Sequence, residues 1–212
     1  MNVLILAGEN ELATRIGQWL KAEQRWTTEP VAPHLVEWAD IGVSCGYRHI
    51  VQPEVLNVLK IVNIHTGYLP FNRGAYPNIW PILDKSPAGA TIHWMDAGLD
   101  TGPIIDQKEV SVEPWDTAFS LYRKLEDVAF DLFTICWDRI ADGSVTSIDQ
   151  LVNGEPHRTK ELKDVTLDLN ESRSVREVLA ILRARTFPPY GLVFEEDDKK
   201  WIVRVEMEQI DD

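Results

Sequence analysis

With 212 residues, of which 44% are hydrophobic and 26% charged, the chain can form one globular core domain with a small appendage. Its formal net charge of −13 disfavours DNA or tRNA as the main ligand, because nucleic-acid binding depends on clustered Lys and Arg side chains. The early apolar run over residues 3–7 is too short for a signal-peptide core or a membrane span, so neither is expected.

The first part of the chain alternates apolar strands with helical segments. Strands are expected over residues 1–6, 38–44 and 60–65. A helix is expected after the first strand, and a short one over residues 53–59. Residues 23–34 are polar and contain proline, so irregular structure is expected there. This rhythm predicts the fold class: α/β, with a Rossmann-like doubly wound sheet.

The central part continues with a loop over residues 66–78 that is rich in Gly, Pro and Asn. Two further strands, over residues 90–95 and 104–112, are expected to pair antiparallel. The strongest helical pattern covers residues 117–140, and Asp116 is expected to cap it.

The composition changes after about residue 150, which predicts a core domain over residues 1–150 and a small α+β appendage over residues 151–212. Ser174 and Glu177 form a capping box that opens a short helix. A hairpin should follow, with strands over residues 190–195 and 201–206. Its apolar residues are Leu192, Phe194, Trp201, Val203 and Val205. Two strands cannot bury these side chains alone, so they should meet the core or a second subunit.

Two polar side chains mark the end of the strand expected over residues 60–65. Asn63 and His65 are two residues apart, so on a strand they point to the same face. Ligands of open α/β sheets usually bind at the carboxyl edge of the strands. Asp100, in a Gly-flanked turn, can supply the carboxylate that orients a histidine. The three residues provide the donor, the proton carrier and the orienting group that acyl transfer to an amine requires.

Pattern alone leaves other possibilities open. His34 and His93 are equally possible catalytic histidines, and Asp100 can simply cap its turn. No glycine-rich phosphate loop is present. Cys45 and Cys136 match no metal-ligand spacing. No metal is expected, and free thiols in the cytoplasm are the expected state of both cysteines.

Two stretches of the sequence favour the catalytic interpretation of Asn63, His65 and Asp100. Residues 63–82 read NIHTGYLPFNRGAYPNIWPI, and residues 89–104 read GATIHWMDAGLDTGPI. Both resemble the folate-dependent formyltransferase family and occur in the family's order, within a resemblance that covers about residues 40–140. The resemblance places the family's catalytic Asn, His and Asp at Asn63, His65 and Asp100.

Details of the resemblance favour the sugar branch of the family. The segments FNRG at residues 71–74, PNIW at 77–80 and RARTFPPY at 183–190 look like those of the nucleotide-sugar N-formyltransferases. There are also departures from the family. The segment over residues 23–37 is short, so one strand–helix unit of the sheet is expected to be reduced or lost. The C-terminal part is too small and acidic for the tRNA-binding domain of methionyl-tRNA formyltransferases, and the regulatory module of formyl-tetrahydrofolate hydrolases is not expected.

The resemblance also implies ligands and the residues that bind them. The formyl donor is 10-formyl-tetrahydrofolate, and the acceptor is a primary amine on a nucleotide-linked amino sugar, expected to be a dideoxy sugar. Folate-binding positions are expected at Gly46, Tyr47, Arg48, Met95, Asp96 and Leu99. Acceptor-binding positions are expected at Tyr68, Asn72, Arg73 and Gly74. Arg73 can hold a phosphate or carboxylate group, or it can brace its own loop.

Two alternative functions remain open. A glycinamide ribonucleotide transformylase is the nearest alternative enzyme, and a non-catalytic folate- or nucleotide-binding module is the alternative of another class. The leading hypothesis implies a cytoplasmic homodimer that acts in lipopolysaccharide or O-antigen synthesis, without nucleic-acid or membrane partners.

Overall fold

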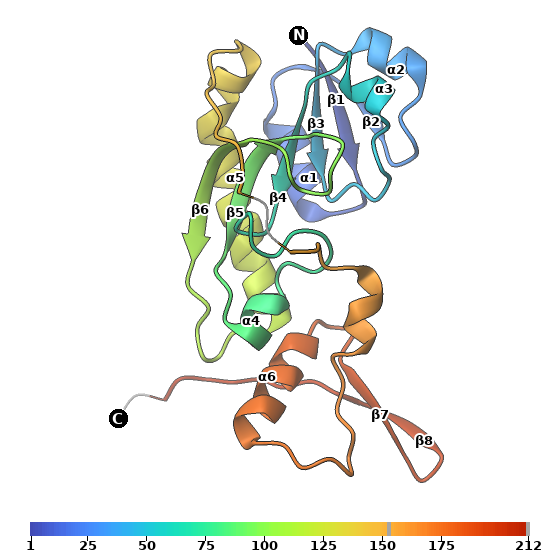
Figure 1. Ribbon diagram of the computed structural model, residues 1–212, viewed down its shortest axis with the longest axis vertical. Coiled ribbons are helices and arrows are strands. Elements are labelled where there is room, and N and C mark those ends of the chain that lie inside the picture. Colours follow the sequence, from blue (N-terminus) through green and yellow to red (C-terminus); the bar gives the residue numbers. More distant parts are fainter. Residues whose placement is uncertain (152–153, 211–212) are drawn as a thin grey trace.

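The computed structural model describes residues 1–151 and 154–210, and a mixed six-stranded sheet forms its centre (Figure 1). The strands lie in the order β2-β1-β3-β4-β5-β6. Their bounds are β1 Asn2–Ala7, β2 Glu23–Thr27, β3 Ile41–Cys45, β4 Ile61–His65, β5 Ala88–Trp94 and β6 Ile104–Val110. The first four strands are parallel, β5 is antiparallel to β4, and β6 is antiparallel to β5, as the sequence predicted for this last pair.

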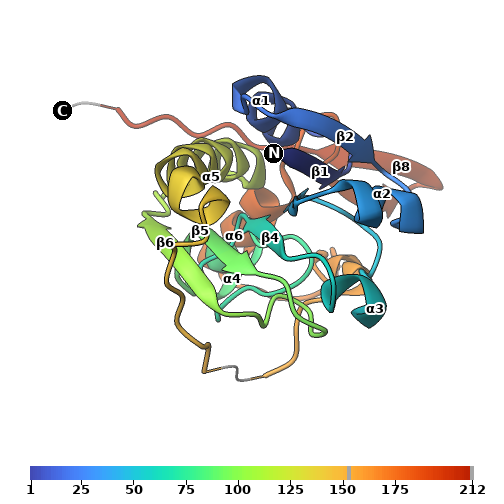
Figure 2. The same cartoon turned by 90° about the horizontal axis from the view of Figure 1, so that it is seen from above.

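Helices cover both faces of the parallel part of the sheet, as Figure 2 shows from above. Strand β1 is followed by α1 (Glu11–Trp19), β2 by α2 (Pro33–Trp38) and β3 by α3 (Pro53–Leu56). The long helix α5 (Ala118–Ala141) follows β6. In β1, Val3 and Ile5 pack in a core cluster with residues of α1 and α5, whereas Leu4 and Leu6 pack toward α2 and α3. This explains the uninterrupted apolar run of β1, because every side chain of a doubly covered strand is buried. The predicted Rossmann-like α/β fold is confirmed.

The expectation of irregular structure over residues 23–34 is correct for residues 28–32 and wrong for the rest. Strand β2 pairs in parallel with β1 along the edge of the sheet, and α2 begins at Pro33. The strand β2 is largely exposed, so it lacks the apolar pattern of a buried strand and is defined by its pairing. The strand expected over residues 38–44 is β3, and it begins later, at Ile41, because Trp38 is the last residue of α2. The strand–helix unit that was expected to be reduced or lost is short but present.

Helix α5 is confirmed, but its N-cap differs from the prediction. The cap is Thr117, whose side chain and that of Ser120 form a capping box. Asp116 instead accepts hydrogen bonds from the Glu113 amide, the Ser120 hydroxyl and the Lys124 ammonium group. A carboxylate one residue outside the cap therefore ties the first turns of the helix to the preceding loop.

The C-terminal region packs against the lower half of the core (Figure 1). It contains a 3₁₀ helix η1 (Thr159–Lys163), helix α6 (Val175–Arg185) and the hairpin β7 (Leu192–Glu196) and β8 (Lys199–Val203). A second core cluster joins it to α4 (Trp80–Asp84) and to the first turns of α5. From the C-terminal side this cluster contains Val165, Ile181, Ala184 and Leu192.

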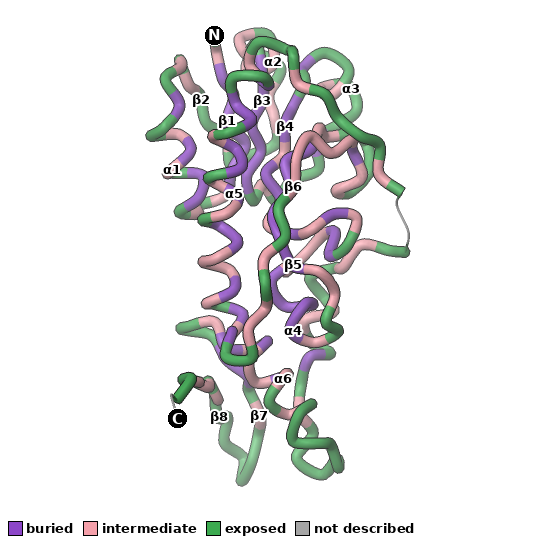
Figure 3. The backbone as a smooth tube through the Cα atoms, turned by 90° about the vertical axis from the view of Figure 1, so that its left-hand side faces the viewer, coloured by how far each residue is buried: buried purple, intermediate pink, exposed green. Residues whose placement is uncertain are grey.

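The hairpin is largely exposed, as Figure 3 shows, and several of its exposed side chains are apolar. In its register Phe194 lies opposite Trp201, while Val193 lies opposite Ile202 on the other face. Trp201 is 51% exposed, and Val193 and Ile202 are each 48% exposed. The predicted position of Val205 within the second strand is wrong, because β8 ends at Val203. Within residues 1–151 and 154–210, no helix is long and apolar enough to cross a membrane.

Candidate active site

Polar side chains gather on one face of the sheet, where the strand direction changes from parallel to antiparallel. Asn63 and His65 of β4 lie opposite His93 and Thr91 of β5, and such opposed pairs share a face. The alternate residues Val62, Ile64, Ala90 and Ile92 point into the core under α5. The expected position at the carboxyl edge is correct for His65, the last residue of β4. Asn63 lies within the strand, so the group occupies the sheet face as well as its edge.

The loop that follows β4 covers this face. The Thr91 hydroxyl donates to the Gly67 carbonyl (2.7 Å) and accepts from the Leu69 amide (3.1 Å), which docks the loop on β5. A Cβ atom on Gly67 would lie 2.4 Å from Nε2 of His65, so only glycine permits this approach. Nε2 of His65 lies 3.0 Å from the carbonyl oxygen of Asn72. The loop therefore closes over the imidazole, which is only 8% exposed.

Asp100 reaches the same place from the turn between β5 and β6. Its Oδ2 accepts from the Gly74 amide (2.8 Å) and lies 3.6 Å from Nδ1 of His65. Its Oδ1 accepts from Nδ2 of Asn63 (3.3 Å). Burial by itself raises the pKa of Asp100, but the positive charge of a protonated His65, the adjacent His93 ring and the bond from the Gly74 amide outweigh it. The pKa of Asp100 is held well below its usual value, and the group is a carboxylate at neutral pH.

The predicted trio is thus brought together. Both ring nitrogens of His65 face oxygen atoms, Nδ1 toward Asp100 and Nε2 toward the Asn72 carbonyl. Each hydrogen of a protonated His65 ring therefore has an acceptor, so these surroundings stabilise the ring once it has taken up a proton.

The residues expected to bind the acceptor lie in the loop over His65. Tyr68 is half-buried against β5, where a Cβ on Gly89 would approach its ring to 2.8 Å. Asn72 is buried and bonded to the Pro87 carbonyl and to the hydroxyl of Ser86. The guanidinium of Arg73, only 6% exposed, donates to the carbonyls of Leu99 and Gly154. Gly74 contributes its amide to Asp100. In this structure, then, Arg73 braces its loop.

The residues expected to bind folate lie in two segments that meet one core cluster. Tyr47 and Met95 both pack against the group of Leu4, Leu6, Val51, Leu59 and Ile61. Gly46 follows β3 with a φ of 62°, and the Tyr47 hydroxyl donates to the Glu29 carbonyl (2.6 Å). The Asp96 carboxylate accepts from the Gly98 amide and the Thr101 hydroxyl, which closes the turn. The side chain of Leu99 is 48% exposed.

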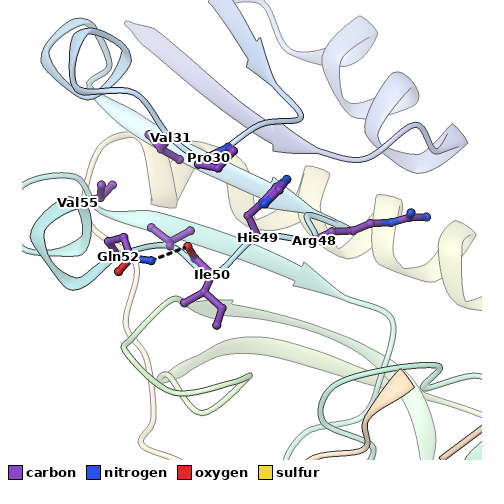
Figure 4. Close-up of a pocket in the computed structure, with 8 residues that line it drawn as sticks. Pro30, Val31, Arg48, His49, Ile50, Gln52 and Val55 are labelled. Atoms are coloured by element: carbon purple, nitrogen blue, oxygen red, sulfur yellow. Dashed lines mark hydrogen bonds between the residues drawn. The ribbon is translucent and has the colours of Figure 1, made fainter. Parts of the chain in front are cut away.

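One cavity lies beside the first of the expected folate segments, and another lies beside the expected acceptor loop. The larger, of about 320 Å³, lies beside Arg48 and is drawn in Figure 4. It is lined by Pro30, Val31, Arg48, His49, Ile50, Val51, Gln52 and Val55. The smaller, of about 190 Å³, lies beside the loop over His65. It is lined by Pro70, Phe71, Asn72, Arg73, Asp84, Ser86, Glu155 and His157. Within the described parts of the chain, no three His, Cys, Asp or Glu side chains form a group that could hold a metal ion.

The sequence matches a family model over most of the region that builds this site. Residues 18–134, more than half of the chain, match the family described as Formyl transferase. The chain belongs to the formyl transferase family. Residues 162–209 match a second model, the N-formyltransferase dimerization C-terminal domain. The resemblance of residues 63–82 and 89–104 to formyltransferases is thereby confirmed.

Individual relatives agree with this family. The dTDP-4-amino-4,6-dideoxyglucose formyltransferase of Mycobacterium tuberculosis is 34% identical over 177 residues, which are 82% of this chain and 76% of that protein. A 4-N formyltransferase from Francisella tularensis superposes with a TM-score of 0.89 at 28% identity, over 99% of this chain and 98% of its own. The formyltransferase PseJ of Anoxybacillus kamchatkensis was solved with UDP-4,6-dideoxy-4-formamido-L-AltNAc and tetrahydrofolate. It has a TM-score of 0.70 at 32% identity, over 77% of this chain and 89% of its own.

One residue of this candidate site could not be chosen from the sequence. His93 is 2% exposed, and its Nδ1 lies 2.9 Å from the Trp94 carbonyl, which can only accept. A neutral His93 therefore carries its hydrogen on Nδ1, and its Nε2 accepts from Nδ2 of Asn63 (3.0 Å). His93 thus fixes the orientation of Asn63. The missing signal was the antiparallel pairing of β4 with β5, because only this register brings the two residues together.

Proposed function

We propose that this enzyme transfers a formyl group from 10-formyl-tetrahydrofolate to the primary amine of a nucleotide-linked dideoxy amino sugar. The observation that carries the proposal is the convergence of Asn63, His65 and Asp100 on one sheet face, in a chain of the formyl transferase family. The choice of acceptor rests on the relatives, since the M. tuberculosis protein is named for a dTDP-linked amino sugar and the A. kamchatkensis protein was solved with a UDP-linked formamido sugar.

The proton path begins at the acceptor amine, which must be neutral to attack the formyl carbon. His65 removes a proton from the attacking nitrogen, directly or through a water molecule, while Asp100 stabilises the charged ring from 3.6 Å. A new C–N bond forms to the acceptor, and the bond between the formyl carbon and the folate nitrogen breaks. The proton then passes from His65 to that folate nitrogen, so no net proton is consumed.

The developing oxyanion needs hydrogen-bond donors. The amide of Asn63 and the protonated ring of His65 are the proposed donors. The two Nδ2 hydrogens of Asn63 point to His93 (3.0 Å) and Asp100 (3.3 Å), so donation to the oxyanion draws on the longer of these bonds. Loss of one such donor lowers the rate by roughly a hundred- to a thousandfold.

The folate site is proposed to lie between the segment after β3 and the turn after β5. Gly46, Tyr47 and Arg48 stand on one side, and Met95, Asp96 and Leu99 on the other. The apolar cluster that Tyr47 and Met95 share supports this placement, because an aromatic ligand needs a largely apolar recess.

The acceptor is proposed to approach along the loop that carries Tyr68, Asn72, Arg73 and Gly74. This loop contacts His65 through the Asn72 carbonyl and borders the smaller cavity. Since Asn72 and Arg73 are buried and bonded within the protein, we propose that they shape the loop, and that the exposed parts of Tyr68 and the loop backbone contact the sugar nucleotide.

A substrate screen tests the proposal. The purified protein is incubated with 10-formyl-tetrahydrofolate and each of a set of dTDP- and UDP-linked amino sugars, and tetrahydrofolate release is followed together with the mass of the product. We expect release with at least one dideoxy amino sugar nucleotide. Release with glycinamide ribonucleotide alone would establish the alternative transformylase. Folate binding without turnover on any acceptor would favour the non-catalytic binding module.

We also propose that the enzyme is a homodimer assembled through its C-terminal hairpin. The match of residues 162–209 to a dimerization domain and the exposed apolar side chains Val193, Trp201 and Ile202 support this. Apolar surface of this kind is stabilised when a second subunit covers it. Both cysteines are free and buried, which accords with the proposed cytoplasmic location.

Trp201→Lys should convert the dimer to a monomer, because a charged group at an apolar interface loses its hydration. Light scattering should give about twice the chain mass of 24.2 kDa for the wild type and the single mass for the variant. Ile135→Lys is the matched control, since Ile135 is an exposed apolar residue of α5 far along the chain from the hairpin. A wild type of single mass would contradict the proposal. A point substitution is preferred to deletion of residues 188–212, because Leu192 belongs to the core cluster.

A further inference from the structure

The backbone conformation of Asp100 sets the direction of its carboxylate, and this conformation is one that aspartate rarely adopts. Asp100 has a φ of 55°, in the left-handed region that non-glycine residues rarely occupy. Two residues later, a Cβ on Gly102 would lie 1.8 Å from the Trp94 carbonyl oxygen, so the turn lies directly on β5. Asp96 closes the turn around Asp100, because its carboxylate accepts from the Gly98 amide on one side and from the Thr101 hydroxyl on the other. Among the described residues, no group of the turn donates to the carbonyls of Asp100 and Gly102, so a tie to these carbonyls comes from outside the turn.

A side chain from a distant segment supplies this tie. Nε2 of Gln150 lies 3.2 Å from the carbonyl oxygen of Asp100 and 2.6 Å from that of Gly102. A primary amide has two hydrogens, so a single group can bridge both carbonyls. Gln150 is itself placed by the backbone of Ile148, which exchanges two hydrogen bonds of 2.8 Å with Ile104 at the start of β6.

The other end of this side chain is unused. Oε1 of Gln150 is buried and has no hydrogen-bond partner among the described residues. A buried acceptor without a partner is unfavourable, so the two bonds made by the nitrogen are what stabilises this placement of the side chain. His157 in turn holds the Gly74 amide, which is the donor to the Asp100 carboxylate. The His157 amide donates to the Arg73 carbonyl, and the His157 carbonyl accepts from the Ala75 amide, each at 2.9 Å, on either side of Gly74.

We propose that Gln150 is a positioning residue for catalysis: its amide fixes the left-handed turn so that the Asp100 carboxylate meets His65. The inference rests on the proposed function, in which Asp100 stabilises the charged ring of His65. Without the bridge, the turn relaxes away from its left-handed conformation, and the carboxylate moves relative to the imidazole. A misplacement of about 1 Å in a catalytic group can cost on the order of a hundredfold in rate.

The test uses Gln150→Leu, which keeps the size of the side chain but cannot donate. We expect kcat to fall about 10- to 100-fold with both KM values little changed, because the turn positions a catalytic group and need not touch either substrate. Gln24→Leu is the matched control, since Nε2 of Gln24 also bridges two carbonyls, those of Gly17 (2.8 Å) and Leu20 (3.0 Å), beside the opposite edge of the sheet. The control should retain wild-type kcat.

Two further measurements separate positioning from a general loss of stability. In an Asp100→Ala background, adding Gln150→Leu should change kcat by less than about twofold, because the two residues act through one carboxylate. The Gly74 amide, which donates to Asp100, should exchange its hydrogen faster in Gln150→Leu but not in Gln24→Leu. Wild-type kcat and Gly74 exchange in Gln150→Leu would overturn the inference, as would effects that multiply in the double variant. Full activity of Asp100→Ala alone would instead overturn the assignment of Asp100, and with it this inference.

Discussion

His65→Asn is expected to lower kcat by about 100- to 10,000-fold while the protein stays folded, because a positioned general base contributes this much to proton transfer. Asparagine can keep a polar contact to the Asn72 carbonyl, but it cannot take a proton from the attacking amine. The KM for the formyl donor should change little, since the proposed folate segments at Gly46 and Met95 do not include this residue. Steady-state kinetics with both substrates gives the result.

His34→Asn is the control for this experiment, since it makes the same change at an exposed histidine of α2. It should keep wild-type kcat and the same circular dichroism spectrum. Retention of more than about a tenth of wild-type kcat in His65→Asn would show that the proton carrier is another group. His93 would not be that group, because its Nε2 lone pair accepts from the Asn63 amide and its Nδ1 donates to the Trp94 carbonyl, which leaves no nitrogen lone pair to take up a proton.

The order of the elements could be predicted from the sequence wherever burial imposes a pattern. Strand β1 and helix α5 were predicted correctly, because a doubly covered strand and a half-buried helix each leave a periodic apolar signal. Strand β2 was missed, since it is an exposed edge strand whose only determinant is its pairing with β1. Pairing partners far apart in sequence leave no local pattern.

The same limit explains what could be predicted of the site. Asn63 and His65 could be chosen because they are two apart at a strand end, and Asp100 because it lies in a glycine-flanked turn. Their meeting point depends on the antiparallel pairing of β4 with β5 and on the loop over Gly67, neither of which the sequence determines locally. His93 and Gln150 reach the trio only through these long-range contacts. The family resemblance supplied the trio, but not the groups that hold it in place.

Asp100→Ala is expected to lower kcat at least about a hundredfold, because the charged ring of His65 loses the carboxylate that orients and stabilises it. The substitution also leaves the Gly74 amide and one hydrogen of the Asn63 amide without their acceptor. The free energy of unfolding at neutral pH should therefore fall as well, by about 1–3 kcal/mol for an unsatisfied buried donor. Activity and urea denaturation are measured on the same preparations.

The pH dependence of this stability difference distinguishes a paired carboxylate from a turn residue. The folded-state pKa of Asp100 is depressed below its unfolded value, so its contribution to stability is present above about pH 4 and is lost as the pH falls toward the folded value. The difference in unfolding free energy between wild type and Asp100→Ala should thus be largest near pH 7 and shrink steadily below pH 4. Asp131→Ala, at an exposed position of α5, should show a small difference at every pH. If Asp100→Ala kept full activity and its stability difference did not vary with pH, Asp100 would only shape its turn, and another group would have to stabilise the charged ring of His65.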